Sequence, residues 1–259
     1  MPIAALLAAQ TDLTAEEMLA FAPSTGSALV PVDPQVALRA GRFAHVPVLY
    51  GGNRDEMRLY VGYEVAAGLK VDAERYPAEL ARRYGDRAPE VLAHYPLTVF
   101  PSAASALGTA ESDYLPPGTL SHCVFLRTEE LLSRHVPVYA YEFTDRGAPP
   151  VMDDPGFELG AVHAAELPYL FPGLTYRSHW DGPHVSARSE PLARAMLGYW
   201  GSFARTGVPT APGRPVWPRY RTPTDVLRLD ASGIGVFDAD AAHQCGFWRS
   251  LYPQLRDGG

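Results

Sequence analysis

Lysine is nearly absent from this chain of 259 residues. Lys70 is the only lysine among 22 basic side chains, and the formal net charge is −7. A chain without a basic stripe lacks the electrostatic footprint that a nucleic-acid backbone requires, so we expect no nucleic-acid partner. Long apolar runs are absent too. No stretch reaches the roughly 20 residues that a membrane-spanning helix needs, so we expect no membrane span.

Cysteine is scarce as well. Cys123 and Cys245 are too few for a disulfide scaffold, and they can pair once or stay reduced, so they do not identify the redox compartment. The opening MPIAALLAAQ has no positive charge before its apolar segment and does not fit a signal peptide, and we leave the localisation open. The single lysine beside many Arg, Ala, Pro and Gly residues indicates a GC-rich genome, which is typical of bacteria.

The rest of the chain alternates helix-like and strand-like patterns. Apolar, β-branched runs predict short buried strands over 46–50, where Gly51-Gly52 ends the strand, over 136–143 and over 226–230. Helical spacing appears between these strands, over 72–95, 122–135 and 189–207. Helices that separate short buried strands predict an α/β layer fold with a mostly parallel sheet. The chain has no internal repeat and no low-complexity linker, so we expect one domain.

The clearest helix is predicted over 189–207. One apolar stripe at helical spacing is formed by Leu192, Met196, Tyr199, Trp200 and Phe203, and Gly207 is placed as a left-handed cap. Gly198 and Gly201 lie inside this helix, where each costs about 1 kcal/mol relative to Ala. We therefore expect close packing at both glycines.

Acidic side chains follow the first predicted strand. Asp55 and Glu56 come directly after it, and in parallel α/β sheets catalytic groups gather beyond the carboxyl ends of strands. A carboxylate at this place can orient a histidine. The alternative is that both acids only cap the following helix, where the helix dipole favours negative charge.

A candidate histidine follows the second predicted strand. His163 lies among the small residues of ELGAVHAAELPYLF, which leave room for another group to approach. Histidine is the side chain best suited to move a proton near neutral pH, although it can equally be a structural histidine. His163 and Glu166 also have the spacing of two metal ligands, but there is no HExxH and no third ligand cluster, so we expect no metal. His243-Gln-Cys245 is interpreted as a packing corner rather than a metal site.

Four segments occur in one order along the chain: AGRFAHVPVLYGGNRDE, ELGAVHAAELPYLF, WGSFARTGVPTAPGRPVWPRY and HQCGFW. Together they resemble the closing half of the type-B carboxylesterases, the α/β-hydrolase family of para-nitrobenzyl esterases and cholinesterases. The resemblance runs from about residue 6 to residue 248. It implies the C-terminal portion of an α/β-hydrolase fold, a partial and mostly parallel sheet flanked by helices.

The resemblance also implies site residues. The acid of the family's catalytic triad is the glutamate of an N-x-D-E segment, which falls on Glu56, and the base is the histidine of an H-x-x-E-L-P segment, which falls on His163. This agrees with the chain order of nucleophile, acid and histidine in α/β-hydrolases. The family implies small to medium carboxylic esters as substrates and no cofactor, because the nucleophile, acid and base are all side chains.

The chain departs from the family at two places. Met57 stands where the family commonly has Gly, and because Met tolerates positive φ poorly we expect a change in the acid loop. The larger departure is that no G-x-S-x-G nucleophile segment and no Gly-rich oxyanion loop occur anywhere in the 259 residues. We therefore interpret residues 1–259 as the C-terminal part of a single α/β-hydrolase domain whose N-terminal half is absent, and expect it to be inactive alone, with an unpaired sheet edge and an exposed apolar face.

Three functional hypotheses remain open. The chain is a piece of a serine carboxylesterase, a non-catalytic cholinesterase-like interaction module, or one half of an esterase whose serine lies on a complementing chain. We favour the first hypothesis, because Glu56 and His163 have no evident role in a pure interaction module.

Overall fold

The computed structural model describes residues 2–5, 8, 25–116, 120–172 and 185–257. The chain forms two compact units, residues 1–44 and residues 45–259. In the first unit the helix α3 (Pro34–Arg39) begins after Asp33, whose carboxylate accepts hydrogen bonds from the backbone N–H groups of Gln35 and Val36. The prediction of a single domain stays a prediction.

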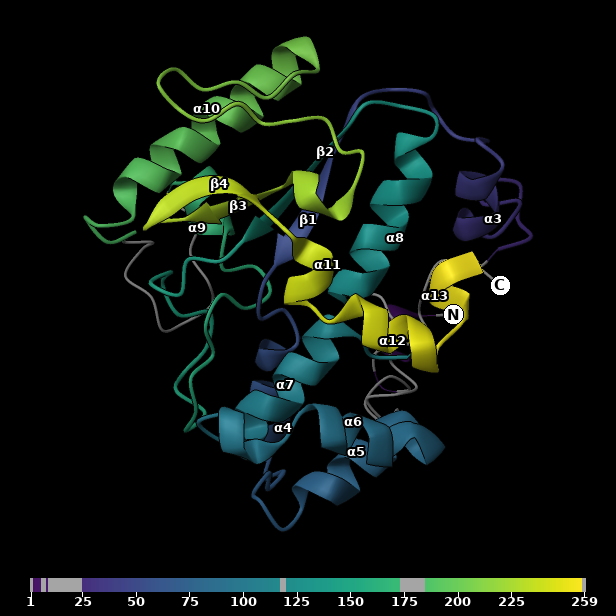
Figure 1. The fold of residues 1–259 in the computed structure, drawn as a ribbon, viewed down its shortest axis with the longest axis vertical. Helices are drawn as coiled ribbons and strands as arrows, with labels where there is room; N and C mark the ends of the chain where they lie inside the picture. The colour runs from purple at the N-terminus through teal and green to yellow at the C-terminus, as the bar shows by residue number, and fades with distance from the viewer. Residues whose placement is uncertain (1, 6–7, 9–24, 117–119, 173–184, 258–259) are drawn as a thin grey trace. The chain divides into compact units, whose positions relative to one another are not determined.

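The second unit is built on a four-stranded sheet (Figure 1). Its strands are β1 (Val48–Asn53), β2 (Val138–Phe143), β3 (Val226–Asp230) and β4 (Gly233–Phe237), in the order β1-β2-β3-β4. The first three strands are parallel, and β4 is antiparallel to β3. The mostly parallel sheet is therefore confirmed. The strand β4 was not predicted, because the two glycines of Gly-Ile-Gly-Val-Phe weaken the apolar pattern.

The end of β1 differs from the prediction. The strand runs through Gly51 and Gly52 to Asn53 instead of ending at the glycines. A Cβ on Gly51 would lie 2.0 Å from the carbonyl oxygen of Tyr141, and a Cβ on Gly52 would lie 2.3 Å from the ring of Phe125. The glycines thus permit close approach of neighbouring atoms within the sheet layer, and they do not terminate the strand.

Helices cover the sheet and extend below it (Figure 1). They are α4 (Arg58–Ala66), α5 (Tyr76–Tyr84), α6 (Ala88–His94), α7 (Ala103–Asp113), α8 (His122–Ser133), α9 (Leu167–Leu170), α10 (Glu190–Thr206), α11 (Ala239–Ala242), α12 (Cys245–Leu251) and α13 (Gln254–Asp257). The helix predicted from His122 is confirmed as α8. The predicted 72–95 segment forms α5 and α6, which a short 3₁₀ turn, Gly85–Arg87, separates.

Opposite faces of the sheet carry different chemistry. Tyr139 and Phe143 of β2 pack in a hydrophobic core with α10, whereas Glu142 of β2 faces His122 of α8. Alternate residues of a strand point to opposite faces, so α10 and α8 cover the two sides of the sheet. The α8 side therefore combines helix packing with buried charge.

The helix predicted over 189–207 is confirmed as α10, with its cap at Gly207 and its close packing at Gly198. Gly207 has φ +72° and its N–H donates to the carbonyl of Phe203, as a left-handed cap requires. A Cβ on Gly198 would lie 3.0 Å from Cβ of Ala211, so close packing is confirmed there. A Cβ on Gly201 would meet, among the described residues and apart from adjoining helix backbone, only the side chain of Arg205 of the same helix within 4 Å, so the prediction is wrong for Gly201.

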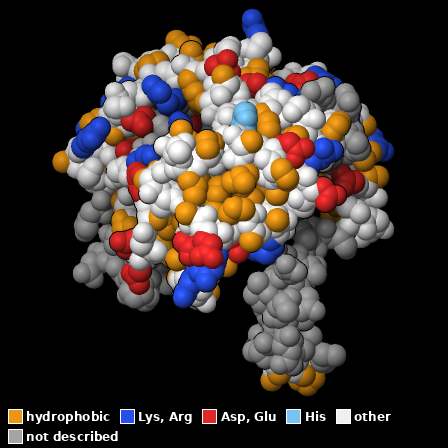
Figure 2. Space-filling model, turned by 60° about the horizontal axis from the view of Figure 1, so that its bottom comes forward, with side chains coloured by type: hydrophobic (Ala, Val, Ile, Leu, Met, Phe, Trp, Pro, Cys, Tyr) orange, Lys and Arg blue, Asp and Glu red, His pale blue; other side chains and the backbone are white. Residues whose placement is uncertain are grey.

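Part of the surface is apolar. The strand β1 forms one edge of the described sheet, and large side chains such as Val99 and Phe171 are more than half exposed. Hydrophobic side chains gather near the middle of one face in Figure 2. No helix in the described ranges has the length and apolar character to cross a membrane.

Candidate active site

Glu56 and His163 are 107 positions apart in the sequence and lie in direct contact. His163 Nδ1 is 2.8 Å from Glu56 Oε2, in the geometry of an N–H donor to a carboxylate. The side chain of Glu56 is 5% exposed and that of His163 is 40% exposed. A buried acid thus holds a histidine that solvent can reach.

The end of β1 fixes the carboxylate of Glu56. The backbone N–H of Asn53 donates to Glu56 Oε1 over 2.7 Å. A Cβ on Gly52 would lie 2.7 Å from the same oxygen, so a side chain at this position would displace the carboxylate. The helix α4 follows the N-cap residue Met57 without a side-chain capping hydrogen bond, and the carboxylates of Asp55 and Glu56 instead accept from the N–H groups of Ala161 and Asn53.

Asp55 fixes the loop that carries His163. Its backbone N–H donates to the carbonyl of Ala161, and its Oδ2 accepts from the N–H of Ala161 over 3.0 Å. Two guanidinium groups hold the other side of this carboxylate, Arg58 at 3.4 Å and Arg146 at 3.1 Å. Gly160 has φ +77°, and a Cβ there would lie 2.2 Å from Asp55 Oδ2. The small residues before His163 were expected to leave room for another group, and at Gly160 that group is the carboxylate of Asp55.

Asn53 joins the two loops through its side chain. Its Nδ2 donates to the carbonyl of Val162 over 2.8 Å and to Oε2 of Glu166. Burial raises the pKa of Glu166, and the hydrogen bond from Asn53 opposes that rise. Within the described part of the chain, neither His163 nor Glu166 belongs to a group of three side chains placed to hold a metal ion.

The state of His163 follows from its contact with Glu56. The hydrogen bond that His163 donates to Glu56 raises the pKa of His163, burial lowers it, and the charges of Glu56 and Glu166 raise it further. Because Nδ1 carries the donated proton, Nε2 keeps its lone pair in the neutral ring. The ring of Tyr60 lies beside the imidazole of His163, with the two ring centroids 5.8 Å apart. Ala164, the next residue, has φ 69°, a strained value for a residue with a Cβ.

The expectation that Met57 disturbs the acid loop through positive φ is wrong. Met57 has φ −80° and ψ −11°, which is ordinary right-handed backbone. Its N–H donates to Ser112 Oγ over 3.0 Å, so the residue is held by α7 without strain. A residue with a Cβ therefore fits this position.

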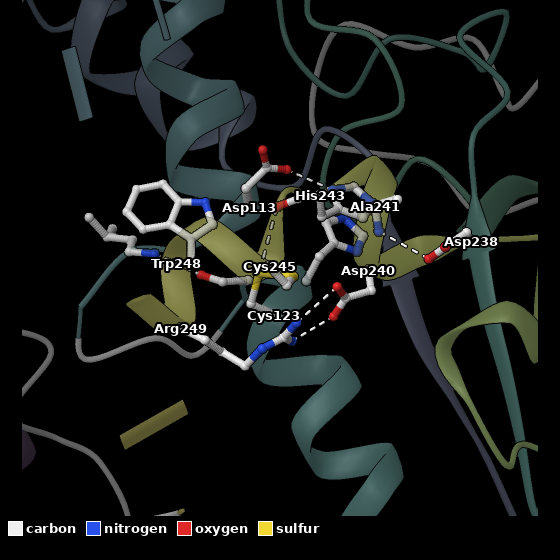
Figure 3. Close-up of a disulfide and its surroundings, with 12 residues drawn as sticks. Asp113, Cys123, Asp238, Asp240, Ala241, His243, Cys245, Trp248 and Arg249 are labelled. Atoms are coloured by element: carbon white, nitrogen blue, oxygen red, sulfur yellow. Dashed lines mark hydrogen bonds and ion pairs between the residues drawn. A yellow bond between two sulfur atoms is a disulfide. The ribbon is translucent and has the colours of Figure 1, made fainter. Parts of the chain in front are cut away.

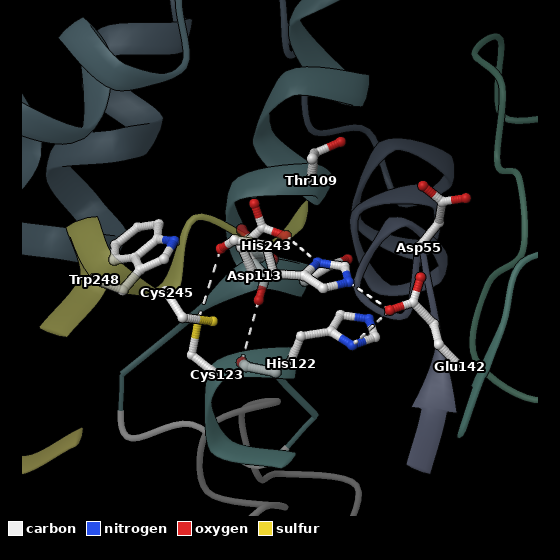
Figure 4. Close-up of polar contacts among 12 residues, drawn as sticks. Asp55, Thr109, Asp113, His122, Cys123, Glu142, His243, Cys245 and Trp248 are labelled. Atoms are coloured by element: carbon white, nitrogen blue, oxygen red, sulfur yellow. Dashed lines mark hydrogen bonds and ion pairs between the residues drawn. A yellow bond between two sulfur atoms is a disulfide. The ribbon is translucent and has the colours of Figure 1, made fainter. Parts of the chain in front are cut away.

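A buried polar cluster that the sequence did not reveal lies beneath this loop (Figure 4). It consists of Asp113, His122, Glu142 and His243, all less than 5% exposed. His243 Nδ1 lies 2.6 Å from Asp113 Oδ1, and His243 Nε2 lies 2.5 Å from Glu142 Oε2. The imidazoles of His122 and His243 stack with centroids 3.6 Å apart. The four residues come from α7, α8, β2 and the segment after α11, so no local motif marks them.

The two stacked histidines differ in protonation. Burial lowers the pKa of His243, but the charge of Glu142 and the hydrogen bonds of Asp113 and Glu142 outweigh it and raise the pKa to about 10. Burial and the charge of His243 lower the pKa of His122 to about 4. Burial raises the pKa of Glu142, but the two histidines outweigh it and lower the pKa to about 2. His243 is therefore a buried cation between two carboxylates, stacked on a neutral ring.

Three members of the same cluster are of the residue types that bind metal ions. His122, Glu142 and His243 place one ligand atom each within 4.8 Å of one another. The two rings, however, are nearly parallel, with planes 8° apart. Imidazole lone pairs lie in the ring plane, so stacked rings cannot direct both nitrogens at one ion, and the geometry fits an ion pair better than a metal centre.

The cluster connects to the acid of the site. His122 Nε2 lies 3.0 Å from the carbonyl oxygen of Asn53, and the neutral ring donates its proton there. The N–H of the same Asn53 donates to Glu56. One continuous path of hydrogen bonds thus runs from His122 through Asn53 to Glu56.

The two cysteines are joined in a disulfide, which decides the alternative that the sequence left open. Cys123 of α8 and Cys245 of α12 have Cα atoms 5.4 Å apart (Figure 3). His122 precedes Cys123, and His243 lies two positions before Cys245, so the disulfide lies beside the stacked histidines. The burial of His243 and Cys245 agrees with the predicted packing corner, while His243 has the additional role of a buried cation.

Comparison with known proteins gives one consistent result. The carboxylesterase family profile matches residues 2–248. Carboxylesterase 4A of Bos taurus is 26% identical over 228 residues, which is 85% of this chain and 40% of the relative. Acetylcholinesterase of Bungarus fasciatus is 25% identical over 252 residues, 91% of this chain and 40% of the relative. Cocaine esterase of Homo sapiens is 34% identical over 126 residues, 46% of this chain and 20% of the relative.

The chain thus spans about two fifths of the length of Carboxylesterase 4A and Acetylcholinesterase. These relatives come from vertebrates, so the bacterial origin indicated by composition receives no support. The matching family covers nearly the whole chain, and its α/β-hydrolase fold agrees with the helix-flanked, mostly parallel sheet. The chain belongs to the carboxylesterase family.

Proposed function

We propose that this chain supplies the acid and the base of a serine carboxylesterase, with Glu56 as the acid and His163 as the base. The observation that carries the proposal is the 2.8 Å contact between His163 Nδ1 and Glu56 Oε2. It leaves Nε2, the nitrogen that a nucleophile would meet, without its own proton. The partly exposed ring and the buried carboxylate support the same roles.

The proposed reaction uses His163 twice. Its Nε2 takes the proton of a serine hydroxyl as the serine attacks the ester carbonyl, and it then gives that proton to the leaving alcohol. Water hydrolyses the acyl-enzyme by the same proton transfers. Glu56 holds the ring in the required tautomer and stabilises the imidazolium that forms at each step.

The serine of this proposal lies outside the 259 residues. The printed sequence has no G-x-S-x-G, and loss of the nucleophile from such a triad costs on the order of 10⁶ in turnover. We therefore propose that the chain alone is inactive as an esterase. A preceding segment of the same polypeptide, or a complementing chain, would supply the serine and cover the exposed apolar face.

Small to medium uncharged carboxylic esters are the proposed substrates. The described site places the ring of Tyr60 beside His163, and no metal or organic cofactor is required, because the acid, the base and the nucleophile are side chains. The choice among such esters depends on pocket walls that the described residues do not supply alone.

The test begins with the reading frame upstream of the Met1 codon. The longest in-frame product, or the product of an adjoining frame together with this chain, is treated with a fluorophosphonate, which reacts with serines that a neighbouring base activates. We expect labelling that His163→Gln and Glu56→Gln abolish and that the exposed control Glu74→Gln leaves intact. Labelling that survives His163→Gln would refute the proposed base.

A second candidate is a non-catalytic interaction module. The exposed apolar side chains, gathered on the face in Figure 2, favour it. This candidate requires that no upstream or adjoining frame encodes G-x-S-x-G and that the 259-residue chain is soluble and monodisperse by itself. Aggregation of the isolated chain that is prevented by adding the segment or chain with the serine would instead support the triad.

A further inference from the structure

A separate cavity of about 220 Å³ lies beside the loop that follows β1. Neither Glu56 nor His163 lines it. Six charged side chains form much of its wall, namely Arg54, Asp55, Arg58, Asp113, Arg146 and His243. Figure 4 shows Thr109 above Asp113 and His243, with Asp55 to their right. Polar groups from four parts of the chain therefore converge on one hollow outside the Glu56–His163 pair.

The wall carries more cations than anions. Three guanidinium groups and the protonated His243 face two carboxylates, those of Asp55 and Asp113, an excess of two positive charges in a chain of net charge −7. Glu142 and Glu158 contact His243 and Arg146 and balance this excess, but neither of them lines the cavity. The carboxylates that neutralise the cluster are thus partly outside the cavity wall.

The guanidinium groups are positioned and keep donors to spare. Arg58 donates to Thr109 Oγ1 over 2.9 Å and contacts Asp55, and Arg146 donates to Asp55 over 3.1 Å. Each guanidinium has five N–H donors, so several donors remain on both residues. Arg54 makes no side-chain hydrogen bond to any residue in the described ranges. Burial lowers the pKa of Arg58, and a bound anion would offset the cost of keeping that group charged.

We propose that this cavity binds a small tetrahedral oxyanion, a phosphate or sulfate group, through Arg54, Arg58 and Arg146. Guanidinium groups recognise such oxygens by paired N–H donors, and donors from three directions suit four oxygens better than the two of a carboxylate. The volume holds the anion and several waters of about 30 Å³ each. Inorganic phosphate and the phosphate group of a small ester share this chemistry, and the site is independent of the proposed esterase function.

Asp55 connects the proposed anion site to the loop that carries His163. The carboxylate of Asp55 contacts both Arg58 and Arg146 and also accepts from the N–H of Ala161. An anion that draws on the same guanidinium groups changes the electron density on that carboxylate. The amide of Ala161 is therefore a built-in reporter of occupancy.

The full 259-residue chain is titrated with inorganic phosphate, sulfate and phenyl phosphate at pH 7 and constant ionic strength, with chloride as the reference anion. The ¹⁵N amide spectrum is the readout. We expect saturable shifts at Ala161, with Arg54→Gln and Arg146→Gln each weakening binding at least about tenfold, because a charge-assisted hydrogen bond is lost. The exposed Arg194, paired with Glu190 on α10, gives the matched control Arg194→Gln, which should leave binding unchanged.

A second measurement needs no variant and so does not depend on whether the variants fold. Phenylglyoxal modifies accessible arginines, and mass spectrometry counts adducts at each position. Phosphate should protect Arg54 and Arg146 and leave Arg194 reactive. Equal adduct formation with and without phosphate, or phosphate shifts that are no stronger than those of chloride, would overturn the proposal. Tighter binding of phenyl phosphate than of inorganic phosphate would identify an ester as the ligand, and the reverse order would identify the free anion.

Discussion

The Nδ1 atom of His163 lies 2.8 Å from Oε2 of Glu56, although the two residues are 107 positions apart. Two neighbouring residues on β1 and its following loop maintain this contact. Asn53 holds the carboxylate of Glu56 and the carbonyl of Val162, and Asp55 holds both backbone groups of Ala161. The strand end therefore positions both partners of the pair.

Asp55→Asn is expected to lower the free energy of unfolding by on the order of 3 kcal/mol, because it removes one partner of a buried ion pair. Asp55 is 2% exposed, and the new amide would turn an N–H toward Arg58 or toward the N–H of Ala161. Urea unfolding measures the loss. The exposed control Asp86→Asn should change stability little, and an Asp55→Asn loss no larger than the control's would contradict this assignment.

His243 predicts an alkaline limit to stability. Its pKa is about 10 in the folded chain and about 6.5 in an unfolded one, so its stabilisation is complete below pH 6.5 and is lost as the pH rises through about 10. The slope should approach about 1.4 kcal/mol per pH unit between pH 7.5 and 9. The direct measurement is the ¹⁵N shift of the His243 ring, which should remain that of an imidazolium at pH 8. A neutral ring at pH 8 would show that Asp113 and Glu142 do not hold the proton.

The disulfide predicts a redox dependence of stability. Cys123 and Cys245 are 122 positions apart, and a cross-link that closes a loop of this size stabilises by about 4–5 kcal/mol in the chain-entropy description. Urea unfolding with and without dithiothreitol should differ by an amount of this order. The double variant Cys123→Ala with Cys245→Ala should show no response to dithiothreitol. Equal stability of the oxidised and reduced wild-type chains would contradict the prediction.

Gly198 and Gly201 form a matched pair on α10. Gly201→Ala should raise the free energy of unfolding by up to about 1 kcal/mol, because Ala is the better helix former and the side chain that the new methyl would meet in the described part of the chain is the flexible Arg205. Gly198→Ala should gain less or lose stability, because the new methyl would lie 3.0 Å from Ala211. Thermal unfolding of both variants tests the order, and a larger gain for Gly198→Ala would contradict it.

Much of the fold was predictable from local patterns. The three parallel strands and the helices α8 and α10 follow from apolar spacing and cap residues. The end of β1 was misplaced, because Gly51 and Gly52 were treated as terminators. These two glycines allow Tyr141, Phe125 and Glu56 to approach the backbone of β1 closely. The contacts form only in the folded sheet, so the sequence does not show them.

In the candidate site, too, some residues were predictable from the sequence and others were not. Glu56 and His163 were predicted from their place after strands and from the family resemblance. Asn53 and Asp55 lie in the same short segment as Glu56. Their side chains bind residues of the His163 loop, which is more than 100 positions away in the sequence, so the sequence alone did not reveal these contacts. The buried cluster around His243 was missed, because its members come from four elements and none has a neighbour in sequence that signals buried charge.

The pKa of His163, measured by NMR titration of its ring in the wild-type chain and in Glu56→Gln, tests the central relationship most directly. Because Glu56 is the largest cause of the raised pKa, the wild-type value should lie above the ordinary value of about 6.5, and the variant's value should fall to that value or below. The exposed control Glu74→Gln should keep the wild-type value. A His163 pKa that Glu56→Gln leaves unchanged in a folded chain would contradict the claim that Glu56 sets the protonation of this histidine.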